Sequence, residues 1–444
     1  MPTELIGVLV LAVVFTLSSL RGLNMGVLAL VAAFLLGCVW LGRTPQQVLD
    51  GFPAEMFVVL VAVTFLFGIA RVNGTVEWMV RAAMRGAGER LAIMPWVLFG
   101  LAALLCATGA ASPAAVAIVA PIGITFAVRQ GVSPLFVGLM VVNGAAAGSF
   151  APTGILGGII NSTLDNNGLH ASSWQLFAGT FAFNVAVGVV TQLVFGRRRA
   201  RQQAGTGTSS GSGSGSGTSS RSRSRSGTGS GSGTGSGSGS EDPIASAVTL
   251  GAEQATTLGA MLVLVLGTTV FSLDTGFLAL SLTAALALLF RRTARKAYQE
   301  IAWPVVLLVC GIVTYIALLQ SLGVVDSLGR MIAGIGAPLL AALIICYVGG
   351  VVSAFASTTG ILGALMPLAV PFLASGAIGT TGMVIALATA ATVVDASPFS
   401  TNGALVVANT PEHQRDGAYR GLLRWGAGVC VLAPIAAWLI FVVV

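Results

Sequence analysis

Asp395 is the only ionisable residue deep inside an apolar run of this sequence. It lies in the segment VVDASPFSTNGALVVANTP (393–411), where two serines, two threonines and two asparagines also interrupt a stretch that is apolar on both sides. Carboxylates inside membrane segments are costly and are usually functional. Asp395 could be a ligand of a cation, a carrier of a proton, or a structural acceptor that holds irregular backbone, and the sequence leaves these three roles open.

Three other apolar runs are interrupted in a similar way, at TGAAS (108–112), SFAPTG (149–154) and ASTTG (356–360). Irregular backbone at membrane depth survives only where it is buried in protein or lines a cavity. The pairs Ser112-Pro113 and Ser397-Pro398 predict helix starts with a capping serine. The free N–H groups and positive dipole end of such a helix favour an anion.

The four breaks define the expected binding site. No Arg, Lys or His lies near them, so a bound carboxylate would be held by N–H, hydroxyl and amide groups. The alternative is that Ser, Thr and Gly only pack helices together. The residues expected to bind a substrate are Ser112, Thr153, Thr358, Thr359, Ser400, Thr401 and Asn402. The residues expected to hold a coupling ion are Gly109, Ala111, Ser149, Ser357, Asp395 and Ser397.

The composition is that of a membrane protein. Of 444 residues, 55% are hydrophobic and only 8% are charged, against about 25% charged residues in soluble domains. The net charge of +7 comes from basic residues between apolar runs, which argues against nucleic acid as a partner. The two histidines and five cysteines show no metal-binding spacing, so we expect no cofactor and no metal beyond a transported Na⁺.

The chain divides into two similar halves. Residues 205–240 are almost entirely Gly, Ser and Thr, which is typical of a flexible coil and suits either a tolerated insertion or a regulated tail. Around it, sequence blocks recur in the same order, with Pro121 facing Pro367 and Pro152 facing Pro398. This pattern predicts two repeats and a linker between them, at 1–200, 201–250 and 251–444.

Each half is expected to hold five spans and one re-entrant hairpin, with an amphipathic stretch before the hairpin. The expected spans are 5–21, 25–42, 56–72, 134–163 and 174–196, then 256–272, 276–290, 304–320, 380–409 and 421–444. With the arginine-flanked linker in the cytoplasm and both termini outside, only Arg43 and Arg330 of the 22 Lys and Arg residues fall outside. If the hairpins were full spans, many more arginines would move outside.

The segments DASPFSTNGALVVAN, ASTTGILGALMP, GAASPAAVAIVAPI, LNMGVLALVAAFLLG and GFPAEMFVVLVAVTFLFGIARVNGT resemble the malonate/dicarboxylate carriers. That family belongs to the divalent anion:sodium symporters of the ion-transporter superfamily, and the resemblance covers the chain except the linker. It implies two opposed hairpins and two broken helices, as the two inverted repeats derived above contain. It also implies a homodimer, an elevator-like motion, and a site for a dicarboxylate and coupling cations.

The hairpin tips depart from that family. Its sodium-coupled members carry a Ser-Asn-Thr triplet at each tip, whereas these tips read Ala111-Ser112-Pro113 and Ser357-Thr358-Thr359. Asn402 matches an asparagine in the broken helix of relatives. Because both tip asparagines are absent, Na⁺ and H⁺ both remain candidates for the coupling ion.

The sequence therefore predicts an all-α polytopic protein of the cell membrane, plasma or inner, that imports a malonate-like or C4 dicarboxylate. An ion antiporter or oxyanion exporter of the same superfamily is the alternative. An intramembrane enzyme is not expected, because a nucleophilic serine would need a nearby base and no His or Lys lies near the breaks. The expected partners are the dicarboxylate, membrane lipid and a second copy of the chain.

Overall fold

The computed structural model describes most of the chain, and every regular element in the described part is a helix. The described residues are 3–21, 23–87, 93–169, 171–206, 250–271, 273–324, 337–354, 358–374, 376 and 378–443. Most of the expected linker (207–249) lies outside these ranges, as do Ser357 and much of the region expected to hold the second amphipathic stretch (325–336).

The helices of the first half follow the apolar runs of the sequence. They are α1 (Thr3–Arg21), α2 (Met25–Phe34), η1 (Leu35–Trp40), α3 (Pro45–Leu49), α4 (Ala54–Val72), α5 (Thr75–Ala87), α6 (Met94–Ala107), α7 (Ser112–Arg129), α8 (Pro134–Gly148), α9 (Ile155–Asn166) and α10 (Ser173–Thr206). The expected break in the run 134–163 is present, because α8 and α9 are separate helices.

The helices of the second half also follow the apolar runs of the sequence. Its helices are α11 (Ala252–Thr269), α12 (Thr275–Leu289), α13 (Arg291–Ala297), η2 (Tyr298–Glu300), α14 (Trp303–Ser321), α16 (Pro338–Ser353), α17 (Thr358–Ala374), α18 (Thr380–Val393), η3 (Val394–Ala396), α19 (Thr401–Asn409), α20 (Glu412–Trp438) and η4 (Leu439–Val443). The run 380–409 is broken as expected, whereas the basic helix α13 was not predicted from the sequence.

Corresponding helices of the two halves begin with the same type of cap. The side chain of Asn24 accepts hydrogen bonds from the backbone N–H of Gly26 and Val27 at the start of α2. Asp274 accepts one from Phe277 at the start of α12. An Asx side chain at this position satisfies N–H groups that the helix itself leaves free.

Six helical segments in the described part are long and apolar enough to cross a membrane. They are Ala54–Val72, Ser112–Arg129, Ser173–Phe195, Trp303–Ser321, Thr380–Asn409 and Glu412–Val443. The shorter apolar helices include α6, α8, α12 and α16. The described part is thus all-helical and consistent with a polytopic membrane protein.

The two broken helices lie at the centre of the fold. All residues of α8 are buried, and α18 is buried from Met383 to Val393. Each packs against the first helix of its own hairpin, α6 on α8 and α16 on α18. The second hairpin helices cross to the other half, so that α7 packs on α19 and α17 packs on α9. In the same way, α2 packs on α14 and α4 packs on α12, so that each of these helices contacts one from the other half.

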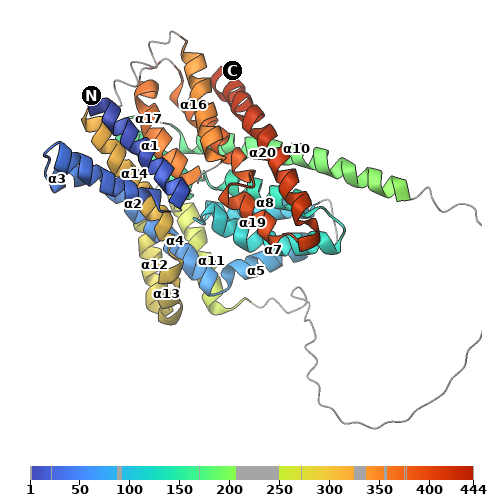
Figure 1. The fold of residues 1–444 in the computed structure, drawn as a ribbon. Helices are drawn as coiled ribbons and strands as arrows, with labels where there is room; N and C mark the ends of the chain where they lie inside the picture. The colour runs from blue at the N-terminus through green and yellow to red at the C-terminus, as the bar shows by residue number, and fades with distance from the viewer. Residues whose placement is uncertain are drawn as a thin grey trace, which may run out of the picture.

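The chain ends and the basic helix α13 lie toward opposite ends of the molecule. Figure 1 shows the start of α1 and the end of the last helix in the upper part of the view, and α13 at its lower end. That the termini and residues 291–300 face opposite sides of a membrane stays a prediction.

Candidate binding site

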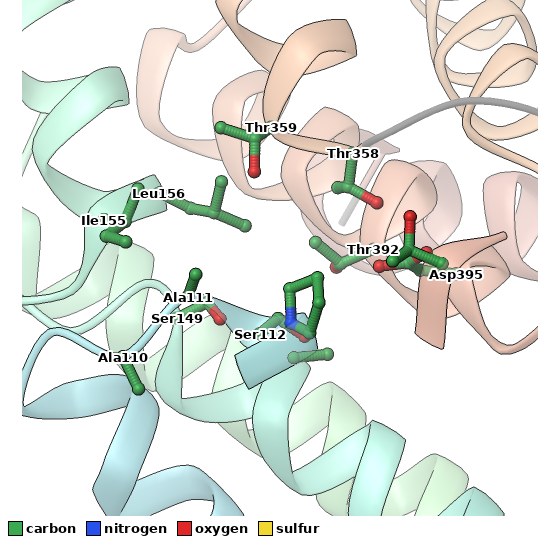
Figure 2. Close-up of a pocket in the computed structure, with 13 residues that line it drawn as sticks. Ala110, Ala111, Ser112, Ser149, Ile155, Leu156, Thr358, Thr359, Thr392 and Asp395 are labelled. Atoms are coloured by element: carbon green, nitrogen blue, oxygen red, sulfur yellow. The ribbon is translucent and has the colours of Figure 1, made fainter. Parts of the chain in front are cut away.

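A small cavity lies where the two hairpin tips meet the two broken helices (Figure 2). It is lined by Ala110, Ala111, Ser112, Pro113, Ala146, Ser149, Ile155, Leu156, Thr358, Thr359, Thr392, Asp395 and Thr401. Its volume is about 30 Å³, which is room for one or two water molecules. A dicarboxylate is several times larger than a water molecule, so the tips or the breaks must separate before one can enter.

The cavity has a polar side and an apolar side. Thr358, Thr392 and Asp395 gather on one side, while Ile155 and Leu156 lie on the other (Figure 2). The polar side belongs to the second half of the chain and the apolar pair to the first. A ligand in this space would therefore meet hydroxyl and carboxyl groups mainly from α17 and the second broken helix.

Backbone groups hold the first break between α8 and α9. The carbonyl of Ser149 accepts hydrogen bonds from the N–H groups of Leu156 and Gly157, both at 3.1 Å. The hydroxyl of Ser149 donates to the carbonyl of Ala145, at 2.7 Å. The hydroxyl of Thr153 donates to the carbonyl of Ala107 at the end of α6. The break is therefore tied to the first hairpin by neutral groups alone.

Serine side chains hold the second break between α18 and α19. The hydroxyl of Ser400 lies 2.5 Å from the carbonyl oxygen of Asp395 and 2.7 Å from that of Ser397, and it accepts from the N–H of Gly403. Ser397 donates its hydroxyl hydrogen to the carbonyl of Ala354, at 2.8 Å. The second break is thus tied to the end of α16, the first helix of the second hairpin.

Asp395 is joined to the other half of the chain through Asn402. The amide nitrogen Nδ2 of Asn402 donates to the carboxylate Oδ2 of Asp395 and to the hydroxyl Oγ of Ser112, both at 2.8 Å. Thr358 also hydrogen-bonds the Asp395 side chain, and its hydroxyl lies 3.0 Å from that of Ser353. A network of hydroxyl, amide and carboxyl groups therefore crosses from α7 to α17.

The amide oxygen of Asn402, unlike its amide nitrogen, takes no part in this hydrogen-bond network. Oδ1 is buried and has no hydrogen-bond partner among the described residues. Buried polar atoms normally have a partner. A free amide oxygen close to a carboxylate is the type of ligand pair that hard cations prefer.

Two expected helix caps are wrong. Ser112 is the first residue of α7 and Ala111 stands at the cap position, without a side-chain cap. The Ser112 hydroxyl instead accepts from Asn402. Ser397 does not cap α19 either, because the chain remains irregular for three more residues and Ser400 is the cap. In both cases the proline that follows the serine suggested a helix start one or more residues away from the real one.

The structure brings many of the expected site residues together. Around the cavity it places Ala111, Ser112, Ser149, Thr358, Thr359, Asp395 and Thr401. Ser397, Ser400 and Asn402 do not line it. Ser400 and Asn402 hydrogen-bond Asp395, and Ser397 donates to the carbonyl of Ala354. Thr153 and Gly109 do not line it, and Ser357 lies outside the described residues.

Sequence reasoning missed several lining residues. Most of them are apolar: Ala110, Pro113, Ala146, Ile155 and Leu156. Thr392 is the polar exception, and it stands one helical turn before Asp395. That spacing is the signal that could have found it, since residues three apart share a helix face.

The first third of the chain is similar to a known family. Residues 1–149 match the family model described as "Dicarboxylate carrier protein MatC N-terminus". The match runs from α1 to the start of the first break, so it includes the first hairpin with Ser112 and ends at Ser149. A comparison with curated proteins gives no match.

Proposed function

We propose that this protein is a secondary active transporter that imports a small dicarboxylate, malonate-like or C4, across the cell membrane. The observation that carries the proposal is the cavity between two hairpin tips and two broken helices, which hydroxyl groups and the Asp395 carboxyl line on one side. Transporter sites built from discontinuous helices are found near the bilayer midplane in this way. The similarity of residues 1–149 to a dicarboxylate carrier family supports the substrate class.

The groups around the cavity suit a carboxylate. The hydroxyls of Ser112, Thr359 and Thr401 are donors, and the positive N-terminal ends of α7 and α19 favour an anion. Among the described residues that line the cavity there is no lysine, arginine or histidine. A bound dianion would therefore meet no fixed positive charge among these residues, and an ionised Asp395 would add a negative charge.

This charge problem is the reason for proposing cation coupling. A dianion beside an ionised carboxylate is repelled unless a cation lies between them or the carboxyl takes up a proton. Asp395 Oδ2 and the unpartnered Oδ1 of Asn402 are oxygens that would serve Na⁺, while protonation of Asp395 would serve H⁺. In either case substrate and ion bind together, which is the requirement for symport.

We also propose an inverted repeat with both termini outside and the linker in the cytoplasm. The matched pairs α7 with α19 and α9 with α17 support a twofold relation between the halves. A homodimer with an elevator-like motion follows from the resemblance in sequence. An ion antiporter of the same architecture would use the same breaks without a dicarboxylate.

Transport in proteoliposomes tests this function. Purified full-length protein is reconstituted, and uptake of radiolabelled malonate, succinate and sulfate is measured with Na⁺ and H⁺ gradients imposed separately. We expect accumulation of a dicarboxylate that depends on one of the two gradients. Sulfate uptake alone, or cation exchange without any dicarboxylate flux, would contradict the proposal.

A further inference from the structure

A basic pocket lies on α13, the helix at the lower end of Figure 1, and shares no lining residue with the cavity between the breaks. It is lined by Ala287, Arg291, Arg292, Ala294, Arg295 and Tyr298, and its volume is about 470 Å³. Three of the six lining residues are arginines, and all three are exposed. The pocket therefore offers up to fifteen guanidinium N–H donors, by about five per arginine, to something that is not part of this chain.

The carboxylates close to this pocket are already engaged. Glu300 pairs with Arg71, with 2.6 Å between Oε2 and the guanidinium nitrogen. Glu253 accepts a hydrogen bond from the hydroxyl of Thr293 on α13. No ion pair joins a described carboxylate to any of the three pocket arginines. Among the described residues the positive charge of the pocket is thus uncompensated, and an external anion would neutralise it.

Exposed apolar side chains adjoin the arginines. Leu288 and Leu289, in the last turn of α12, are 76% and 68% exposed. Tyr298 is 57% exposed, and its ring lies 4.5 Å from that of Phe65 on α4. A soluble anion would gain nothing from these leucines, whereas a lipid has both an anionic head and acyl chains to cover them.

The corresponding helix of the other half has no such features. In α3 (Pro45–Leu49) the sequence is PQQVL, without a charged residue, and it follows the second helix of its half as α13 does. The basic pocket is therefore not a by-product of the repeated fold, and it belongs to one side of the molecule only.

We propose that the α13 pocket binds the headgroup of an anionic phospholipid. The phosphodiester lies among Arg291, Arg292 and Arg295, and the acyl chains run along the exposed leucines at the end of α12. Clusters of arginine and lysine next to a membrane helix attract anionic lipid in this manner, and the planar guanidinium is suited to bidentate phosphate contacts. This site is independent of the transport cavity.

Native mass spectrometry of the delipidated full-length protein tests the site. Dioleoyl phosphatidylglycerol and dioleoyl phosphatidylcholine are titrated in detergent, and bound lipid is counted. We expect phosphatidylglycerol to be retained at lower concentration than phosphatidylcholine. The triple variant Arg291→Gln/Arg292→Gln/Arg295→Gln should weaken phosphatidylglycerol binding by about tenfold or more, as removal of several membrane-facing charges does.

A matched control removes the same charge elsewhere. Arg415, Arg420 and Arg424 are exposed on α20, and their triple Gln variant should bind phosphatidylglycerol like the parent. The triple Arg→Lys variant at α13 keeps the charge but loses the planar fork, so its phosphatidylglycerol binding should lie between those of the parent and the Gln variant. Elution as a single size-exclusion peak shows that each variant is folded. Equal phosphatidylglycerol binding by parent and α13 Gln variant would overturn the proposal. Displacement of the lipid by millimolar inorganic phosphate would overturn it as well, since the site would then be one for a soluble anion.

Discussion

The two broken helices share one backbone design but differ in charge. When Pro152 is aligned with Pro398, Gly157 corresponds to Gly403, and each is the third residue of its second half-helix. A Cβ at Gly157 would lie 2.3 Å from the carbonyl oxygen of Ala151, and one at Gly403 would lie 1.8 Å from that of Ser397. In both breaks the half-helix therefore starts in direct contact with a carbonyl six residues earlier.

The side chains at corresponding positions diverge. Ser149 corresponds to Asp395 and Leu156 corresponds to Asn402. The first break thus carries a hydroxyl and an apolar side chain where the second carries a carboxyl and an amide. Both breaks position helix ends, while of the two only the second carries an ionisable side chain, Asp395.

The largest effect on transport is expected from removing the negative charge of Asp395. In Asp395→Asn the amide keeps the shape of the side chain and loses the negative charge, so gradient-driven accumulation should be abolished while some substrate exchange remains. Ser149→Ala, at the corresponding position, should have a smaller effect because that hydroxyl already donates to Ala145. Counterflow is measured beside gradient-driven uptake in proteoliposomes with equal protein content. If Asp395→Asn accumulates substrate as the parent does, the carboxyl is only a structural acceptor.

A smaller effect, on the stability of the fold, is expected from substituting the two glycines that the breaks share. Gly157→Ala and Gly403→Ala should each lower the free energy of unfolding by about 1–3 kcal/mol, the usual range for overpacking. The loss should be larger for Gly403, where the added Cβ comes closer to the carbonyl oxygen. Thermal unfolding in detergent measures this, with Gly428→Ala as the control because open space surrounds that position. Unchanged stability in both variants would show that the breaks can relax and are not close-packed.

The smallest effect is expected at the hairpin tips. Ser112→Ala and Thr358→Ala each remove a neutral hydroxyl at the cavity, which is worth about 0.5–1.5 kcal/mol. Substrate affinity should fall by about two- to twelvefold, without loss of coupling. Concentration dependence of uptake gives the affinity, and the accumulation ratio gives the coupling. A tip variant that transports substrate but no longer follows the gradient would move the ion site from the second break to that tip.

Hydropathy and break residues predicted most of the architecture. A helix that is buried on all sides is apolar on all sides, as α8 is except for Asn143, so hydropathy finds it. Gly, Pro and Ser at Gly148–Gly154 and at Ser397–Ser400 revealed the breaks, because few other residues tolerate such backbone.

The remainder depends on three-dimensional contacts. The bond from Asn402 to Ser112 joins residues 290 positions apart, and no local pattern encodes it. Leu156 has no polar signal at all, yet it lines the cavity. The helical tendency of the seven-residue helix α13 comes from Arg, Lys and Ala. Hydropathy reveals only apolar segments and therefore gives no sign of this helix.

The small volume of the cavity has a kinetic consequence. A space of about 30 Å³ admits water but no diacid, so encounter with a substrate cannot be productive until the tips have parted. Association that waits for such a rearrangement is slower than diffusion allows. The observed binding rate would then level off at high substrate concentration, at a value set by the opening step and independent of which diacid is used.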